Sequence, residues 1–301
     1  MTQWWLNDYR IEGLLGRGGM GVVLRARHVR THAPVAIKLL TSKASRSSDF
    51  VDAFHREIRA VAQLDHRNIA AILDTGVVES ASPDFIVPVE RGAPFYAMQL
   101  IEDGTLTDHA AGLEWQTFRS LLGAVLDALA HAHARGIIHR DLKPANILIA
   151  REGARLVPKL TDFGLADLTL SDDDAGRGPR LTKERRVLGT PRYMAPEQIL
   201  GHWRDQGPWT DLYALGCIAY RQISGRLAFD GEAHDILKAH LEAPVPPIPQ
   251  SICPQTVQQW LWRLLEKSPQ RRFRHAADAA HDEPEVAVGD ARHRREQQRR
   301  G

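Results

Sequence analysis

The first hundred residues alternate between apolar and polar positions in short runs, a pattern typical of β-strands. Residues 9–15 alternate loosely up to a glycine-rich segment at 16–21, and the alternation resumes over 22–27. We therefore predict a strand, a glycine turn and a second strand. An apolar run at 35–38 predicts another strand, and it ends on Lys38.

Later segments repeat their apolar residues every three or four positions, which indicates amphipathic helices. The pattern predicts helices over 50–64, 113–135, 236–241 and 257–265. Gly136 ends the second of these, as glycine commonly does at a helix C-terminus. The stripe of the first helix, which we expect to face a core, comprises Phe54, Ile58, Val61 and Leu64.

Composition places the chain among ordinary globular proteins. It has 301 residues, of which 43% are hydrophobic and 25% charged. No run of about 18 apolar residues occurs, so we expect no membrane-spanning helix. The start lacks the basic and apolar regions of a secretion signal, which favours the cytoplasm. Cys217 and Cys253 are isolated, which excludes a disulfide framework and a cysteine-rich zinc site, and we expect both to be buried or neutral.

The net charge of +2 is unevenly distributed. Residues 291–301 hold five arginines against one glutamate, a net of +4, so the preceding residues sum to −2. We therefore expect no specific nucleic-acid binding by the body of the protein. The arginine-rich end is compatible with a solvated disordered tail, a juxtamembrane segment or a weak contact with an anionic surface.

A short polar loop lies between the apolar runs at 136–138 and 147–149. It carries Asp141, Lys143 and Asn146. A carboxylate can accept the proton of an attacking hydroxyl, an ammonium can neutralise charge on a transferring phosphoryl group, and an amide oxygen can hold a metal ion. Taken by itself, the loop is also compatible with an ordinary polar turn between two buried strands.

The glycine-rich segment contains Gly16, Gly18 and Gly21. A dinucleotide-binding fold uses the same spacing, but it needs a helix to begin at the last glycine. A β-branched run follows here, so we predict a hairpin lid whose N–H groups approach phosphates closely. Lys38 stands in an apolar strand, where its charge is costly unless it is matched; a solvated edge position is the alternative.

Two further segments complete a familiar order. Asp162-Phe163-Gly164 follows the polar loop, and residues 189–197 read Gly-Thr-Pro-Arg-Tyr-Met-Ala-Pro-Glu. Together with the loop at 139–146 and the glycine-rich segment, they resemble the signatures of the protein kinases. The resemblance covers residues 9–281. The residues of these motifs are most similar to those of the bacterial eukaryotic-like (Hanks-type) serine/threonine protein kinases.

This resemblance implies an α+β, two-lobed protein kinase fold. A small, mainly β lobe with one regulatory helix is expected over 9–100 and binds ATP. A larger, mainly α lobe over 101–281 carries catalysis and substrate binding, with 209–218 as its buried central helix. Residues 282–301 are expected to form a charged, disordered tail.

The resemblance assigns the catalytic roles to the polar loop. Asp141 is expected to act as the base that receives or orients the hydroxyl, and Lys143 to stabilise charge. A lysine two residues after the catalytic aspartate is typical of the Ser/Thr branch of the family. Autophosphorylation is expected in an activation loop at 168–187, with Thr182 favoured; Thr190 is the second candidate and is expected to contact the catalytic residues.

Nucleotide and metal ligands follow from the same resemblance. Lys38, paired with Glu57, is expected to hold the α- and β-phosphates of ATP. Asn146 and Asp162 are expected to bind two Mg²⁺ ions, for which Mn²⁺ can substitute. The other residues expected to contact the nucleotide are Gly16, Gly18, Gly21, Val23, Ala36, Met98, Gln99, Ile101 and Leu148.

Two structural pairs are implied as well. Asp211 is expected to anchor the backbone of the polar loop, and Arg272 to pair with Glu197. Gln99 replaces the glutamate that is common at this position, which leaves adenine recognition intact because backbone groups perform it. The loop at 78–94 is rich in Pro, Ser and Glu, and the resemblance gives it no role.

Two rivals remain at this level. A pseudokinase scaffold commonly lacks the lysine, the catalytic aspartate or the metal-binding aspartate, and all three are present here. A small-molecule phosphotransferase keeps a similar loop but lacks the 189–197 segment, which implies a bound polypeptide substrate. We expect either a soluble kinase or the cytoplasmic kinase domain of a longer membrane protein.

Overall fold

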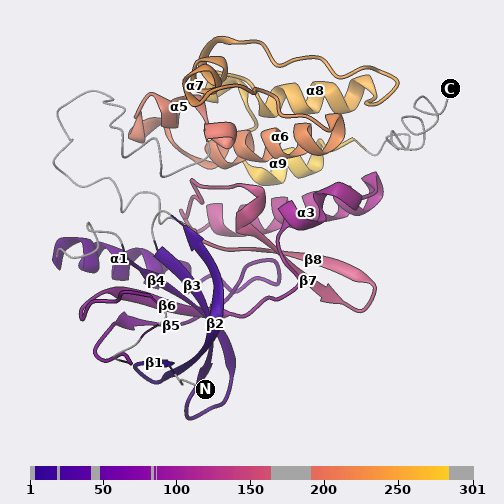
Figure 1. Ribbon diagram of the computed structural model, residues 1–301. Coiled ribbons are helices and arrows are strands. Elements are labelled where there is room, and N and C mark those ends of the chain that lie inside the picture. The colour runs from indigo at the N-terminus through magenta and orange to yellow at the C-terminus, as the bar shows by residue number, and fades with distance from the viewer. Residues whose placement is uncertain are drawn as a thin grey trace.

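The computed structural model describes residues 4–18, 21–41, 48–82, 85, 87–163 and 191–284. They form two lobes, a small one built mainly from strands and a large one built mainly from helices (Figure 1). The predicted α+β, two-lobed architecture is therefore confirmed. No helix in these ranges is long and apolar enough to cross a lipid bilayer.

The small lobe is a six-stranded antiparallel sheet in the order β1-β2-β3-β4-β6-β5. Gly21 faces β4 so closely that a Cβ atom there would lie 2.0 Å from the carbonyl oxygen of Leu39. A larger residue would force the two strands apart. The strands are β1 (Trp4–Leu6), β2 (Tyr9–Gly18), β3 (Gly21–His28), β4 (Pro34–Leu40), β5 (Ile72–Val77) and β6 (Pro94–Gln99).

The sheet begins before residue 9, where the sequence placed the boundary of the small lobe. Strand β1 and the residue after it are held by the end of β5 and the segment that follows: the amide of Trp5 donates to Ser82 Oγ over 2.8 Å, and Asn7 Nδ2 donates to the carbonyl of Val77 over 2.8 Å. Ser82 of the 78–94 loop thus forms hydrogen bonds with the first strand.

Helix α1 (Ser48–Val61) connects the cores of the two lobes. Its buried Phe54 and Ile58 pack with Tyr96 and Met98 of β6, whereas Val61 joins the core of the large lobe. Figure 1 places α1 on the side of the sheet nearest that lobe. All four residues of the predicted stripe, Phe54, Ile58, Val61 and Leu64, are buried as expected.

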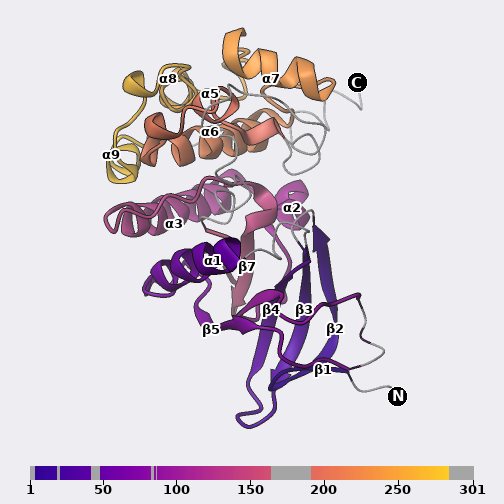
Figure 2. The same ribbon diagram turned by 90° about the vertical axis from the view of Figure 1, so that its left-hand side faces the viewer.

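Helix α6 (Pro208–Ser224) forms the centre of the large lobe, and the other long helices pack around it (Figure 2). Thirteen of its seventeen residues are buried, as expected for the central helix. Cys217 on α6 and Cys253 are both buried, as predicted. The remaining helices are α2 (Leu106–His109), α3 (Trp115–His133), α5 (Pro196–Ile199), α7 (Ala233–Glu242), α8 (Gln255–Leu264) and α9 (Ala276–His281), and β7 (Ile147–Glu152) pairs with β8 (Arg155–Leu160) in a hairpin.

The lobe extends slightly beyond the predicted end at residue 281. Glu283 forms an ion pair with Arg119 of α3, with 3.3 Å between Oε1 and Nε. Burial raises the pKa of Glu283, against the opposing effect of this arginine. The rest of the predicted tail, residues 285–301, lies outside the described residues.

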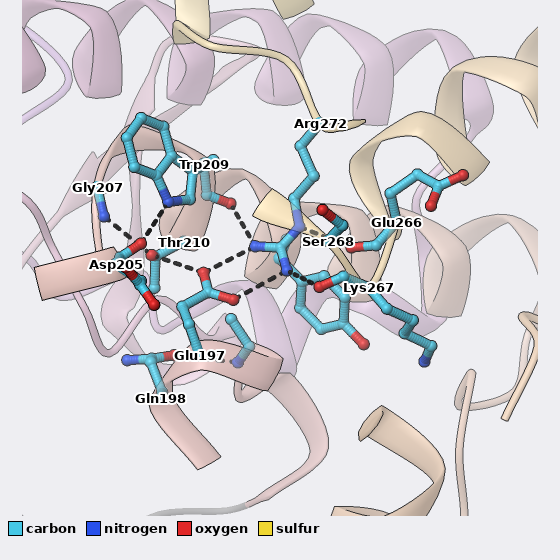
Figure 3. A network of polar contacts seen from close by, with 12 residues as sticks. Glu197, Gln198, Asp205, Gly207, Trp209, Thr210, Glu266, Lys267, Ser268 and Arg272 are labelled. Atoms are coloured by element: carbon cyan, nitrogen blue, oxygen red, sulfur yellow. Dashed lines mark hydrogen bonds and ion pairs between the residues drawn. The ribbon is translucent and has the colours of Figure 1, made fainter. Parts of the chain in front are cut away.

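A closed polar network ties α5 to the segment before α9 (Figure 3). Arg272 donates from Nη1 to Glu197 Oε1 over 2.8 Å and from Nη2 to Oε2 over 2.9 Å. The hydroxyl of Thr210 donates to the same carboxylate over 2.8 Å. The predicted pair of Arg272 and Glu197 is confirmed, and its side chains are almost completely excluded from solvent.

Candidate active site

Asp211 of the central helix fixes the backbone of the polar loop at 139–146. Its carboxylate accepts hydrogen bonds from the amides of His139 and Arg140, each over 2.8 Å. Arg140 has a φ of +63°, a conformation that strains a residue with a side chain. The predicted anchoring role of Asp211 is confirmed, because the two bonds hold the loop in this strained shape.

His133, at the end of α3, supports the same anchor. Its Nε2 lies 2.8 Å from Asp211 Oδ2, and both side chains are buried. Burial opposes ionisation of Asp211, but the bond to His133 and the charge of that histidine outweigh it, so the pKa of Asp211 is lowered. The carboxylate therefore stays ionised as an acceptor for the loop amides.

Three side chains of the loop converge on one point. Lys143 Nζ lies 2.6 Å from Asp141 Oδ2, and Asn146 Nδ2 donates to the same oxygen over 3.1 Å and to the carbonyl of Asp141 over 2.8 Å. The Asp141 side chain is 36% exposed, so a hydroxyl from outside can reach it. Asn146, by contrast, is buried. The structure thus brings these three predicted residues together.

Asp162 faces the small lobe. Lys38 Nζ of β4 lies 2.6 Å from its Oδ2, and the hydroxyl of Tyr96 on β6 donates to its Oδ1 over 2.6 Å. Burial opposes ionisation of Asp162, but Lys38 and the Tyr96 hydroxyl outweigh it, and the pKa of Asp162 is lowered. Burial, followed by the charge of Asp162, raises the pKa of Tyr96 well above its ordinary value, so the phenol keeps its proton.

The predicted pairing of Lys38 with Glu57 is not present in this structure. Lys38 forms its ion pair with Asp162, and the described residues include no ion pair between Lys38 and Glu57. Glu57 lies beside the buried stripe of α1 and is partly exposed. The physical reason is proximity: Asp162 offers Lys38 a carboxylate at 2.6 Å in a site that is only 12–19% exposed. The lysine is therefore matched, but by a different carboxylate.

The backbone beside Asp162 is tied to the polar loop. The amide of Thr161 donates to the carbonyl of Asn146 over 3.1 Å. The ring of Phe163, buried to 2% exposure, packs on His139 with 4.6 Å between ring centroids. Asp162 itself has a φ of +65°. These contacts hold the main chain of Asp162 next to Asn146, the other predicted metal ligand.

The residues expected around adenine lie on strands at the junction of the lobes. Ala36 stands opposite Met98 in the register of β4 and β6, and both are buried. Val23 stands opposite Lys38 on the neighbouring strand. Leu148 of β7 forms a β-bridge with Thr105, which lies in the segment that connects β6 to α2.

The backbone amides at the end of β6 and in the segment that connects it to α2 differ in their hydrogen bonding. The amide of Gln99 donates to the carbonyl of Ala71 over 2.9 Å. The amide of Ile101 makes no hydrogen bond to any residue that the structure describes. The amide of Ile101 can therefore donate a hydrogen bond to a nucleobase, in line with the predicted contact of Ile101 with the nucleotide.

The glycine-rich hairpin has room for phosphates. A Cβ atom built on Gly16 or Gly18 would meet nothing within 4 Å, so no described protein neighbour requires glycine there. Gly21 differs, because its contact with β4 excludes a side chain. Open space beside two glycines, with Lys38 on the strand opposite Val23, fits a ligand that approaches the backbone closely.

A divalent metal fits the chemistry of Asn146 and Asp162. Asn146 directs its amide nitrogen to Asp141, which leaves the amide oxygen for a cation. Within the described ranges, no group of three His, Cys, Asp or Glu could hold a metal by itself. Mg²⁺ is commonly bound by one or two protein oxygens together with substrate phosphates, and this pair suits that mode.

Sequence reasoning missed Tyr96 and the contact of His133 with Asp211. Tyr96 lies in an apolar strand, where an aromatic residue signals only a buried position. His133 lies in a helical segment, where spacing does not reveal a carboxylate partner 78 positions away. The Asp-Phe-Gly segment could have drawn attention to Tyr96 only with the strand register in hand. Thr182, Thr190 and Gly164 lie outside the described residues.

Comparison with known proteins agrees with this geometry. The sequence matches the family model described as protein kinase domain over residues 9–283. The serine/threonine-protein kinase Pkn1 of Myxococcus xanthus is 40% identical over 271 residues, which is 88% of this chain and 36% of that protein. The serine/threonine-protein kinase PknA of Mycobacterium tuberculosis is 35% identical over 287 residues, covering 93% of this chain and 62% of that protein. The chain thus spans between about a third and two thirds of these relatives.

A solved structure supports the fold. The crystal structure of a mutant of the PknI kinase domain of Mycobacterium tuberculosis aligns with a TM-score of 0.66 at 24% identity and covers 92% of this chain and 94% of that chain. The family model covers most of the sequence, including the polar loop and the residues that anchor it. The chain therefore belongs to the protein kinase domain family.

Proposed function

We propose that this domain transfers the γ-phosphoryl group of ATP to serine or threonine hydroxyls of proteins. One observation carries the proposal: Lys143 Nζ and Asn146 Nδ2 lie 2.6 Å and 3.1 Å from Asp141 Oδ2, on a loop that the central helix holds in place. A proton acceptor, a cation and a metal-binding amide within hydrogen-bond reach are the parts that phosphoryl transfer requires.

Asp141 receives or orients the hydroxyl that attacks. Its exposed carboxylate can accept a hydrogen bond from a serine or threonine side chain, which aligns the oxygen for transfer. Lys143 places a positive charge next to that oxygen, where it can stabilise negative charge on the phosphoryl group. Asp141 and Lys143 therefore act on the same reacting centre.

Lys38, Asn146 and Asp162 serve the nucleotide side. When bound, Mg-ATP supplies the phosphoryl group and the metal charge that neutralises it. Asn146 and Asp162 would hold two Mg²⁺ ions, for which Mn²⁺ can substitute. Lys38 would then contact the α- and β-phosphates, and Glu57 is its proposed partner in that state.

The glycines at 16, 18 and 21 are proposed to cover the phosphates. Adenine is proposed to lie between Val23, Ala36 and Leu148, beside Met98 and the backbone of Gln99 and Ile101. Buried apolar walls and one unengaged backbone amide support this placement.

Specificity for Ser and Thr is supported by the names of the relatives Pkn1 and PknA and by Lys143, two residues after Asp141. We propose autophosphorylation on Thr182, with Thr190 as the second candidate. A phosphate on Thr182 could form charge-assisted bonds with Arg140. Because ATP is supplied in the cytoplasm, the proposed activity places the domain there. The relatives are longer, which is compatible with attachment of such a domain to a membrane.

Intact-mass spectrometry tests the proposal. The purified chain is incubated with Mg-ATP beside an Asp162→Asn variant, and peptides from residues 165–195 are mapped. We expect added phosphate on Thr182 or its neighbours in the parent protein and none in the variant. A generic protein substrate is included to detect transfer to another chain.

Two outcomes would contradict the proposal. Absence of phosphate on the parent and on the added substrate would favour a binding scaffold. Phosphate on the Asp162→Asn variant at the rate of the parent would remove Asp162 from the metal site.

A further inference from the structure

Tyr96 contacts the carboxylate that is proposed to bind metal. Its hydroxyl donates to Asp162 Oδ1 over 2.6 Å, while Lys38 contacts Oδ2 over 2.6 Å. Both donors belong to strands of the small lobe, whereas Asp162 follows β8 of the large lobe. One carboxylate is thus held from two neighbouring strands.

The ring of Tyr96 has little freedom to move. Tyr96 is 2% exposed and packs in the cluster that joins α1 to β4 and β6, where Phe54 lies 6.2 Å away between ring centroids. A rigid, buried ring fixes the direction in which its hydroxyl points. The hydrogen bond therefore sets the rotation of the Asp162 carboxylate about its own side-chain bonds.

The main chain of Asp162 is fixed by other contacts. Thr161 is hydrogen-bonded to the carbonyl of Asn146, and Phe163 packs on His139. Asp162 is thereby held beside Asn146 whichever way its side chain points. What remains to be set is the orientation of the carboxylate, and among the described residues only Lys38 and Tyr96 contact its oxygens.

A bond from Tyr96 does not block a metal. Each carboxylate oxygen has two lone pairs, so Oδ1 can accept a hydrogen bond from the phenol and still bind a cation. Carboxylates that bind metals are usually hydrogen-bonded in turn, and loss of such a partner typically weakens metal binding 10–100-fold. Lys38 is proposed to move to the phosphates, which leaves Tyr96 as the lasting partner.

We propose that Tyr96 is a positioning residue whose hydroxyl orients the Asp162 carboxylate for the divalent metal that accompanies the nucleotide. This inference rests on the proposed function, because it takes Asp162 as a metal ligand. It adds a residue from the small-lobe sheet to the metal site, and it makes the placement of β6 a determinant of metal affinity.

Binding of Mn²⁺ tests the inference without reference to activity. The full chain is saturated with a non-hydrolysable ATP analogue and titrated with Mn²⁺, and free Mn²⁺ is measured by electron paramagnetic resonance. We expect Tyr96→Phe to bind Mn²⁺ roughly tenfold more weakly than the parent. Binding of the nucleotide in EDTA, measured with a fluorescent analogue, is expected to be unchanged, because the hydroxyl acts through the metal ligand.

Tyr220→Phe provides the matched control. Tyr220 is 1% exposed on α6, and its hydroxyl has no hydrogen-bond partner in the described structure. This variant also removes one buried phenol oxygen, and we expect Mn²⁺ affinity equal to that of the parent. Tyr96→Leu provides a second hydroxyl-free variant, with the same weakening expected, and circular dichroism reports whether each variant is folded.

The outcomes separate the inference from the proposed function. Equal or tighter Mn²⁺ binding by Tyr96→Phe, with binding lost in Asp162→Asn, would overturn the role of Tyr96 and leave the metal site intact. Nucleotide-dependent Mn²⁺ binding that is absent in the parent, or undiminished in Asp162→Asn, would overturn both.

Discussion

The ion pair of Arg272 with Glu197 and that of Lys38 with Asp162 differ in how completely their atoms are used. Arg272 makes two bonds to the carboxylate of Glu197, and its other N–H groups reach the carbonyls of Trp209, Glu266 and Lys267. The pair is 0–2% exposed. Lys38 makes a single contact with Asp162, and that pair is 12–19% exposed.

This difference separates a structural pair from an exchangeable one. A buried pair whose donors and acceptors are all satisfied cannot change partners without leaving a charge unmatched. Lys38 and Asp162 keep unused donors and lone pairs near solvent, so phosphates and a metal can take over from the protein contact. The same pairing of opposite charges therefore stabilises the fold in one place and leaves exchangeable groups at the proposed nucleotide site in the other.

The largest expected effect comes from the reactive cluster. We expect Asp141→Asn to lower kcat by about 10²–10⁴-fold, because the amide cannot accept the hydroxyl proton. The melting temperature is expected to stay close to that of the parent, since the side chain is 36% exposed. Phosphate incorporation and thermal unfolding measured on the same preparation check both statements. A loss of less than tenfold would remove Asp141 from the chemistry.

Substitution of Arg272 in the buried network with Glu197 should lower stability and leave activity nearly unchanged. Arg272→Met leaves the carboxylate of Glu197 buried without its partner, and we expect a loss of about 3–5 kcal/mol in the free energy of unfolding. Urea denaturation measures this loss. Activity per folded molecule is expected to change little, and a variant with parental stability would show that the pair is dispensable.

The buried His240 of α7 is expected to make the stability of the large lobe depend on pH. Burial, with a contribution from the charge of Lys267, lowers the pKa of His240 from 6.5 to about 4. The unfolded histidine binds a proton near pH 6.5, but the folded one does so only near pH 4. Stability therefore falls as the pH drops from 6.5 to 4, by up to about 3 kcal/mol.

His240→Gln isolates that contribution. In the parent protein, His240 Nδ1 lies 2.9 Å from the hydroxyl of Tyr213, a contact that the glutamine amide can replace. We expect the stability of this variant, measured by urea denaturation between pH 7 and pH 4, to fall less steeply than that of the parent. Parallel curves would contradict the assignment.

The smallest effect is expected at an exposed pair. Arg67 Nη2 lies 3.2 Å from Glu152 Oε2, and both side chains are more than half exposed. Arg67→Met is expected to change the free energy of unfolding by less than about 1 kcal/mol, because water screens such a pair. Urea denaturation beside Arg272→Met gives the contrast directly, and a loss as large as that of Arg272→Met would undo it.

Much of the site follows from the sequence because its residues lie close together along the chain. Asp141, Lys143 and Asn146 fall within six positions, so a single loop brings them together. Residues far apart, such as Asp211 and Arg272, were placed through the resemblance and lie as expected. Adjacent position and a known pattern are thus the two sources of what could be predicted.

Other features depend on packing that no local pattern encodes. Strand β1 has only three residues, too few for a periodic signal, and its hydrogen bond to Ser82 spans 77 positions. Tyr96 reaches Asp162 across 66 positions through the register of β6. The choice of Lys38 between two carboxylates depends on how α1 and Asp162 are placed relative to β4, which composition and spacing do not report.

The strained backbone at Arg140 has a consequence for how damage spreads through the protein. Two amides held by Asp211 keep the loop in its shape before any substrate arrives. The template for that shape is a helix in the middle of the large lobe. Substitutions that loosen this helix, far from any substrate, would therefore register in an enzyme assay as active-site lesions.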